Sequence, residues 1–272
     1  MVQVDLKRKD EIGELGAAFE EMRHRLSQSI RLQLQYEENR KELISNISHD
    51  LKTPITGIKA CIEGIRDGIA DTDAKREKYM RMIAKKTEEM DRLIDELLLF
   101  SKLDLKRLPF HLEPLDLAAY LRDCVEELRL DPRMEGITIT FTGAHDRPVP
   151  VMADREKLRR VIMNIMDNSL KYMDKDQKEI RVELFDDESE ATVRIQDNGP
   201  GIESAALPQI FDRFYRADPS RSTATGGSGL GLAIVKQIVE GQGGRVWAES
   251  RMGEGTSISF TLPKSKHGGE QS

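Results

Sequence analysis

One histidine stands in a run of residues that can carry a phosphoryl group. The run covers residues 48–54 and reads Ser-His-Asp-Leu-Lys-Thr-Pro. The neutral imidazole of His49 has a nitrogen lone pair for attack near pH 7, and Asp50 can accept the proton from the other ring nitrogen. Thr53 follows four residues later on the same helical face, where its hydroxyl can orient a water for the reverse, hydrolytic reaction. These residues predict a nucleophile, although a lone exposed histidine is usually an ordinary surface residue.

The heptad pattern around His49 predicts where its ring points. With Ile44 at a and Ile47 at d, His49 falls at f, the position furthest from the seam. A ring that faces water can be reached by a second domain. Pro54 removes a backbone donor and is expected to bend the helix just past the site.

Apolar residues three and four apart predict two antiparallel helices, at about 31–67 and 73–103. Gly64, Gly68 and residues 71–73 interrupt the pattern between them, and Thr72 or Asp73 is the expected N-cap of the second helix. Two such helices cannot bury their seams alone. We therefore expect a homodimer through residues 31–103, in which two hairpins form a four-helix bundle.

The heptad register shifts once along the first helix. The a positions form two series of seven-residue steps, Ile12, Phe19 and Leu26, then Ile44, Leu51 and Ile58. Between Leu26 and Ile44 the spacing is two heptads plus four residues, a stutter that locally unwinds a coiled coil. The shift is either a harmless irregularity or a joint between an upstream signalling coil and the bundle.

Beyond a proline-marked linker the period of the sequence changes. Strands are expected at 137–141, 180–185, 191–196, 245–249 and 256–262. Helices are expected at 117–130, 155–173 and 230–241. This mixture predicts an α/β sandwich with helices on one face of a mixed sheet.

Polar side chains on the second of these helices suit a nucleotide. Asn164 and Asn168 share one helical face, and Lys171 and Tyr172 follow. Amide oxygens are hard ligands suited to Mg²⁺, and a lysine can neutralise phosphate. In isolation, two such asparagines more often cap or pack than bind a metal.

Two glycine-containing segments also suit a nucleotide. In residues 197–201, Asp-Asn-Gly-Pro-Gly, the glycines let the backbone approach a flat ligand, and the carboxylate can accept from an exocyclic amine. A glycine-rich loop before the last helix includes Gly227, Gly229, Leu230, Gly231 and Leu232. Amides at a helix N-terminus bind phosphates, but the loop is neither a Walker A nor a Rossmann motif. Each segment alone is weak evidence.

The order and spacing of these segments is specific. With residues 211–216, Phe-Asp-Arg-Phe-Tyr-Arg, between the last two, they resemble the N, G1, F and G2 boxes of the ATP-binding fold shared by histidine kinases, gyrase-type ATPases and MutL. Residues 48–54 resemble the H box of sensor histidine kinases. The chain thus resembles a sensor histidine kinase of two-component systems, with a HisKA dimerisation and phosphoacceptor domain and a GHKL-type HATPase_c domain. The resemblance implies an α plus α/β fold, a dimeric four-helix bundle followed by an α/β sandwich.

The resemblance implies ATP and Mg²⁺ as ligands. Asn168 would ligate Mg²⁺ with Asn164 beside it, and Lys171 and Tyr172 would contact phosphate or ribose. Residues 215–228 would form a lid.

The adenine end of the site follows from the same resemblance. Asp197 would read the adenine amine, Gly199 and Gly201 would shape its pocket, and Thr256 lies on a strand that lines it.

The resemblance also implies the reaction. His49 would attack the γ-phosphate, with Arg213 and Arg216 as unranked candidates to stabilise its charge, and the phosphoryl group would pass to an aspartate of a response regulator. The pairing of Asp50 with Thr53 matches kinases that also dephosphorylate their regulator, so both activities are expected.

The N-terminal end resembles the second helix of a HAMP domain. Residues 10–15, Asp-Glu-Ile-Gly-Glu-Leu, followed by Phe19 and Met22, carry this resemblance. Only that half is present, so a missing N-terminal part with membrane spans is expected. The full-length protein would lie at the cytoplasmic face of the bacterial plasma membrane, with this chain as a soluble cytoplasmic fragment. The expected divisions are HAMP half 1–30, phosphotransfer domain 31–106, linker 107–114, catalytic domain 115–264 and polar tail 265–272.

Composition excludes other classes. The chain has 272 residues, room for about two domains, and a net charge of −6, which is unlike a nucleic-acid-binding surface. Its two cysteines lack a CxxC spacing and are expected to be reduced thiols, and no apolar run approaches the ~18 residues of a membrane span. A DNA-linked ATPase of the gyrase or MutL kind would share the nucleotide fold without the H box. A non-catalytic scaffold would have lost His49, Asn168 or the glycines, all of which are present.

Overall fold

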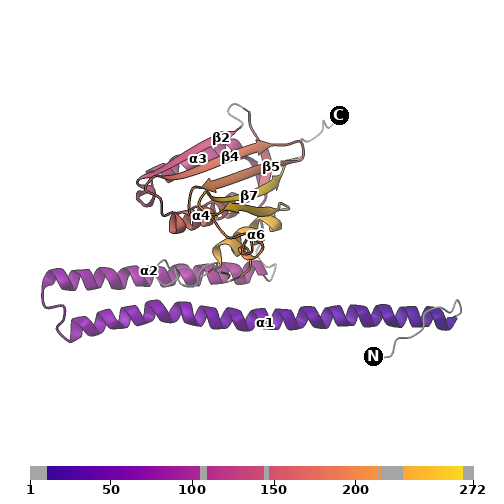
Figure 1. Ribbon diagram of the computed structural model, residues 1–272, viewed down its shortest axis with the longest axis horizontal. Helices are drawn as coiled ribbons and strands as arrows, with labels where there is room; N and C mark the ends of the chain where they lie inside the picture. The colour runs from indigo at the N-terminus through magenta and orange to yellow at the C-terminus, as the bar shows by residue number, and fades with distance from the viewer. Residues whose placement is uncertain (1–10, 105–108, 144–146, 214, 216–228, 266–272) are drawn as a thin grey trace. The chain divides into compact units, whose positions relative to one another are not determined.

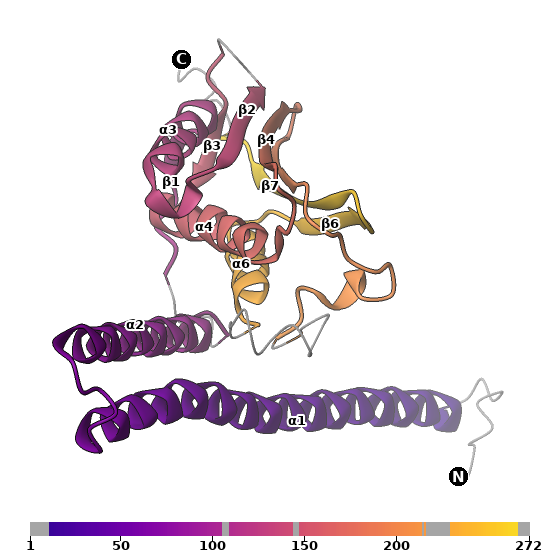
Figure 2. The same ribbon diagram turned by 60° about the vertical axis from the view of Figure 1, so that its left-hand side comes forward.

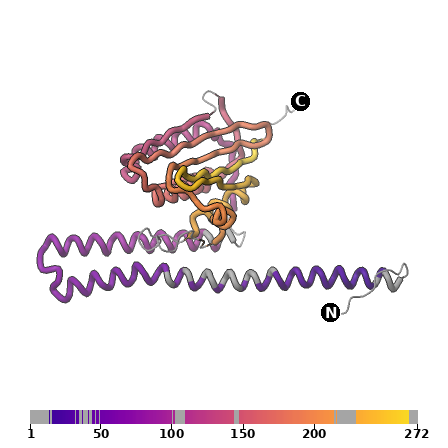
Figure 3. The backbone as a smooth tube through the Cα atoms, in the orientation of Figure 1, coloured from indigo at the N-terminus to yellow at the C-terminus, as the bar shows by residue number. Residues whose placement is uncertain are grey.

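The computed structural model describes residues 11–104, 109–143, 147–213, 215 and 229–265 (Figure 1). Figure 3 also draws in grey parts of the long N-terminal helix, where some side chains are outside the description. The chain divides into two compact units, Met1–Lys52 and Thr53–Ser272. Within the described residues, no helix is both long enough and apolar enough to cross a bilayer.

Helix α1 runs from Glu11 to Arg66 as one element. The sequence predicted the first hairpin helix only from about residue 31. Residues 17–53 contain neither glycine nor proline, so nothing ends the helix between the HAMP-like stretch and the hairpin. The helix ends before Gly68, whose φ of 77° is left-handed and costs glycine little. The amide of Ala70 closes this end by donating to the Gly64 carbonyl over 3.1 Å.

Helix α2 covers Asp73–Asp104 and follows α1 after a short turn (Figure 1). The Thr72 hydroxyl accepts from the Lys75 amide over 3.3 Å, which confirms Thr72 as the N-cap. Gly64 was read from the sequence as a break, and that interpretation was wrong. It lies inside α1, where a Cβ atom would stand 2.5 Å from the ring of Tyr79 on α2, so this glycine lets the two helices approach.

The second half of the chain forms a five-stranded mixed sheet in the order β2-β4-β5-β7-β6. The strands are β2 (Ile137–Gly143), β4 (Lys178–Asp186), β5 (Glu190–Asp197), β6 (Val246–Arg251) and β7 (Gly255–Pro263). β2 and β4 are parallel, and the other neighbours are antiparallel. All five strands were predicted, with ends that differ by a few residues.

Three helices cover one face of this sheet (Figure 2). They are α3 (Leu117–Leu130), α4 (Arg155–Tyr172) and α6 (Gly231–Gly241). Alternate strand residues such as Ile195 and Phe260 meet helix residues such as Leu158 and Ile234 in one buried core. The predicted sandwich, with helices on one face of a mixed sheet, is confirmed.

Four short elements were not predicted. β1 (Glu113–Asp116) and β3 (Pro150–Ala153) form a separate antiparallel pair, and Pro132–Met134 and Leu207–Gln209 are 3₁₀ helices. Glu113 and Pro114, expected in the linker, are the first residues of β1. Strands of four residues that contain proline show no alternation long enough to recognise.

Candidate nucleotide site and phosphoacceptor helix

The polar face of α4 lines a cavity in the α/β domain. Asn164, Asn168, Lys171 and Tyr172 contribute side chains to its wall, and the start of α6 contributes Gly229, Gly231 and Leu232. Both asparagines are half-buried. The fold therefore brings residues of α4 next to residues around the start of α6, although Asn168 and Gly229 are 61 positions apart in the sequence.

The first residue of α6 is bound to α4. The Asn164 side chain donates through Nδ2 to the Gly231 carbonyl over 3.2 Å, which leaves its amide oxygen as an acceptor. Leu230 occupies the N-cap position, and its apolar side chain makes no capping hydrogen bond to the helix amides. Leu230 is only 1% exposed and so anchors the helix start, while Gly229 takes a φ of 68°. Backbone amides without a side-chain cap are suited to phosphate oxygens.

Asp197, which is not among the residues that line this cavity, is held by hydrogen bonds from three donors. Its Oδ2 accepts from the Ser169 hydroxyl over 3.0 Å, and its Oδ1 accepts from the amides of Gly199 and Thr256 over 2.9 and 3.2 Å. These bonds join α4, the end of β5 and the start of β7. A carboxylate has about four acceptor positions, so three donors leave capacity for one more. An amine of a planar base is a suitable fourth donor.

Glycines beside Asp197 are required by close backbone contacts. Gly201 has a φ of 80°, and a Cβ atom there would lie 2.2 Å from the Arg251 carbonyl oxygen. At Gly255, which the sequence pattern did not point to, a Cβ atom would lie 2.0 Å from the carbonyl oxygen of Asp197 itself. A Cβ atom at Gly199 would lie 2.9 Å from Asp197 Oδ1. Together these glycines fix the backbone that presents the carboxylate.

Lys171 and Tyr172 line the same cavity at the C-terminal end of α4. The Lys171 ammonium lies 4.9 Å from the centre of the Tyr172 ring, a distance at which the ring attracts the cation. Amide oxygens, an ammonium group and the amides at a helix N-terminus together fit a polyphosphate with Mg²⁺, which prefers hard oxygen ligands. Arg213, a candidate to stabilise charge on the phosphate, is half-buried. Arg216, Gly227 and most of the proposed lid lie outside the described residues.

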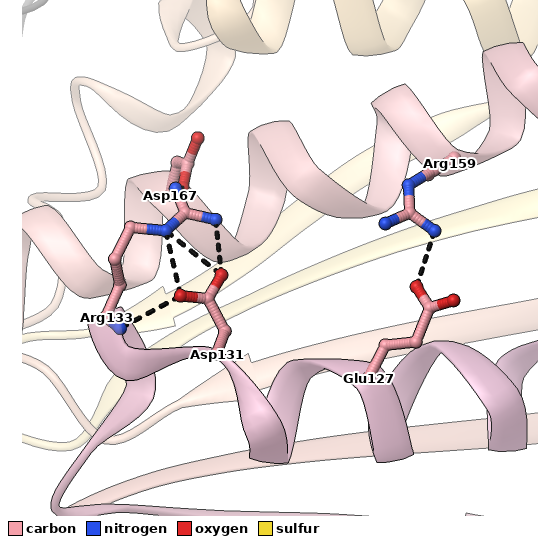
Figure 4. Close-up of polar contacts among 5 residues, drawn as sticks. All are labelled: Glu127, Asp131, Arg133, Arg159 and Asp167. Carbon is pink, nitrogen blue, oxygen red and sulfur yellow. Dashed lines mark hydrogen bonds and ion pairs between the residues drawn. The ribbon is translucent and has the colours of Figure 1, made fainter.

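An ion-pair cluster beside Asn168 was not predicted (Figure 4). Arg133 donates through Nη1 to Asp167 over 3.1 Å and through Nη2 to Asp131 over 2.6 Å. Hydrogen bonds from Arg133 lower the pKa of Asp131, and those same bonds raise the pKa of Arg133. Asp167 directly precedes Asn168, so the cluster ties this turn of α4 to the end of α3. The sequence shows the close pair Asp131 and Arg133, but only the fold brings Asp167 to them.

His49 lies on α1, together with Asp50 and Thr53. The side chain of His49 is outside the described part of the structure. Asp50 is half-buried, whereas Thr53 is exposed. The helix face that carries Ser45, Lys52 and Thr53 is exposed at all three positions.

Three family models match the chain. Residues 153–266 match HATPase_c, the histidine kinase-, DNA gyrase B- and HSP90-like ATPase. Residues 39–106 match HisKA, the His Kinase A phosphoacceptor domain, and residues 2–28 match the HAMP domain. The domains occur in the predicted order.

Curated relatives agree with these matches. The chain is 36% identical over 235 residues to the sensor protein kinase WalK of Staphylococcus aureus strain MRSA252, across 85% of this chain and 38% of the relative. It is 32% identical over 228 residues to the sensor histidine kinase WalK of Bacillus subtilis strain 168, across 84% of this chain and 37% of the relative. The chain therefore spans less than two fifths of the length of these relatives.

Solved structures share the fold. The histidine kinase AdeS of Acinetobacter baumannii aligns with a TM-score of 0.64 at 20% identity, over 80% of this chain and 98% of that one. The histidine kinase ThkA, in complex with the response regulator protein TrrA, aligns with a TM-score of 0.64 at 22% identity, over 94% of this chain and 68% of that one.

The α/β domain is thus an ATPase domain of the histidine kinase, gyrase and HSP90 class, and it follows a phosphoacceptor helix pair. With the HAMP match before them, the chain belongs to the HAMP-linked sensor histidine kinases of two-component systems.

Proposed function

We propose that this chain uses ATP to phosphorylate itself on His49 and then transfers the phosphoryl group to an aspartate of a response regulator. The observation that carries the proposal is the pairing of two features in one domain. The Asp197 carboxylate is held by three donors with room for a fourth, and the N-cap residue of α6 is Leu230, whose side chain makes no capping hydrogen bond. The first suits adenine and the second suits phosphate.

The transfer step follows from the residues of the chain. A ring nitrogen of His49 attacks the γ-phosphorus, so that an N–P bond forms as the bond to the leaving ADP oxygen breaks. Asp50 accepts the proton from the ring. Lys171 and an arginine, with Arg213 and Arg216 as the candidates, balance charge on the phosphate oxygens. Mg²⁺ bound through Asn168 would supply further charge neutralisation, and the amide chemistry there fits it.

The exposure of Ser45, Lys52 and Thr53 supports a phosphoacceptor face that a second domain can reach.

The test of autophosphorylation is incubation of the chain with γ-labelled ATP and Mg²⁺. We expect label that is stable in alkali, labile in acid and absent in His49→Gln. The matched control is His24→Gln, because His24 is also a histidine on α1 and is exposed. Equal labelling of both variants, or no label in the unmodified chain, contradicts the proposal.

We also propose that the chain is a homodimer through its helices. On α1, Ile55 and Ile62 are seven residues apart and 49% and 52% exposed, while Leu51, Ile58 and Cys61 are more buried. This leaves an apolar stripe exposed in the single chain, which a second copy would cover.

The remaining proposals concern the whole protein. The HAMP match and the sensor kinases among the relatives support a membrane-anchored protein. The complex of ThkA with its response regulator supports a response regulator as the partner. The exposed hydroxyl of Thr53, three residues after Asp50, supports a second activity, hydrolysis of the phosphorylated regulator.

A further inference from the structure

The segment that leads from the helices into the α/β domain contains Phe110, which packs in a notch at Gly241, the end of α6. Phe110 is half-buried and packs against the domain core. Its ring lies over Gly241, the last residue of α6, where a Cβ atom would stand 2.5 Å from two ring carbons. Gly241 has an ordinary helical backbone, so any residue could occupy it if the ring were absent. The three atoms nearest to such a Cβ all belong to Phe110, so the close approach of this ring favours glycine here.

A buried carboxylate next to this notch binds the same segment. Asp154 is 5% exposed, and its Oδ2 accepts from the His111 amide over 3.0 Å. Its Oδ1 caps α4 by accepting from the Lys157 amide over 3.0 Å. The backbone amide of Asp154 donates to Oε1 of Gln242 over 2.7 Å, just beyond the end of α6. One residue thus joins the entering segment, the start of α4 and the end of α6.

The same two helices are joined at their nucleotide end. There Asn164 of α4 donates to the carbonyl of Gly231, the first residue of α6. The hydrogen bonds of Asp154 and of Asn164, in the middle of α4, connect α4 to both ends of α6, and the 11 residues of α6 separate these ends by about 16 Å. Phe110 is consequently held at a fixed distance from the glycine-rich start of α6.

We propose that Phe110 and Gly241, which forms the notch, are positioning residues for phosphoryl transfer. They attach the chain from the phosphoacceptor helices to the helix pair α4 and α6 at residue 110. The α/β domain can then rotate relative to the phosphoacceptor helices only through the residues before Phe110. The γ-phosphate is then presented to His49 along a restricted path. This inference rests on the proposed function of His49, but the notch itself can be tested without it.

The first experiment is a double-mutant cycle on the thermal stability of the full chain. Gly241→Ala alone places a methyl group against the Phe110 ring and lowers Tm. In the Phe110→Ala background the methyl group has room, and alanine is preferred to glycine in a helix, so Gly241→Ala leaves Tm unchanged or raises it. This change of sign supports the notch. An equal decrease in Tm in both backgrounds overturns it.

The second experiment separates positioning from binding. In Phe110→Ala, we expect ADP affinity measured by calorimetry to stay within twofold, while the autophosphorylation rate at saturating ATP falls on the order of tenfold. Phe110→Leu restores part of the rate. The control is Leu112→Ala, because Leu112 lies in the same segment and is 44% exposed, and its rate is unchanged.

Each other outcome has a distinct meaning. A normal rate in Phe110→Ala overturns the positioning role, and so does a parallel loss of ADP affinity, which marks Phe110 as a structural residue of the domain. If the unmodified chain carries no label on His49, the proposed function fails, and the Tm cycle still decides whether the notch exists.

Discussion

The helices and the α/β domain bury their apolar side chains in different ways. In the α/β domain Leu158, Ile234 and Phe260 have no exposed surface. On α1 and α2, Leu26 and Met80 each keep 60% of their surface exposed. The domain that holds the nucleotide residues therefore completes its core within one chain. The helices that hold His49 present an apolar surface that the described part of one chain does not cover. Formation of the homodimer should therefore affect phosphorylation of His49 and leave nucleotide binding unchanged.

The strongest test of this contrast is a charge on the exposed stripe of α1. Ile62→Glu would bury a carboxylate in the proposed dimer, so we expect the dimer to weaken by about a hundredfold or more. Sedimentation equilibrium measures the dissociation constant, and ADP affinity should not change. Leu130→Glu is the control, since Leu130 is 84% exposed on the α/β domain. Equal dimer affinity in both variants would show that the stripe is not the interface.

The second test concerns the nucleotide site. Asp197→Asn removes the charge and replaces one carboxylate oxygen by an NH2 group, which faces either the Ser169 hydroxyl or the amides of Gly199 and Thr256. Hydrogen bonds to a charged group are worth about 1.5–3 kcal/mol, so we expect ADP affinity to fall by about 10- to 100-fold. Calorimetry measures this.

The matched control for Asp197→Asn is Asp187→Asn, because Asp187 is exposed in the turn between β4 and β5. The dimer should survive in both variants, which sharpens the contrast with Ile62→Glu. Unchanged ADP affinity in Asp197→Asn would remove Asp197 from the binding site.

Sequence patterns predicted the elements that are set by local period. The helix expected at 117–130 coincides with α3, and the strand expected at 191–196 lies within β5. Patterns failed where contacts between distant segments decide the structure. Gly64 was read as a break because its partner, the Tyr79 ring, is on another helix.

The same limit applies to the site. Asn164, Asn168 and Asp197 were singled out from residue type and spacing; the structure places the two asparagines in the wall of one cavity, and the binding roles of all three stay predictions. The bond of Arg133 to Asp167 and the seat of Phe110 on Gly241 were not, because an arginine in a turn and a phenylalanine in a linker have no distinctive spacing. Such contacts depend on packing, which a single sequence does not display.

The third test separates two activities on the helix. Thr53→Ala removes an exposed hydroxyl and leaves His49 and Asp50 in place. We expect dephosphorylation of the regulator to slow by about tenfold or more, the range of a group that positions a reacting water, while autophosphorylation changes less than twofold. Thr53→Ser should retain the phosphatase. Equal loss of both activities in Thr53→Ala would refute the role of this hydroxyl.

The smallest expected effect is at the ion-pair cluster of Arg133, Asp131 and Asp167, next to Asn168 in the sequence. Arg133→Met removes the cation between Asp131 and Asp167, and partly exposed ion pairs contribute only about 0–1 kcal/mol, so we expect affinity for Mg·ATP to fall by no more than a few-fold. Arg159→Met is the control, because Arg159 joins the same two helices through Glu127 away from Asn168 (Figure 4). The effect of Arg133→Met should shrink when Mg²⁺ is omitted. It should also shrink in high salt, since salt screens the ion pairs. If both variants weaken Mg·ATP equally, the cluster supports the helices in general and has no particular part in placing Asn168.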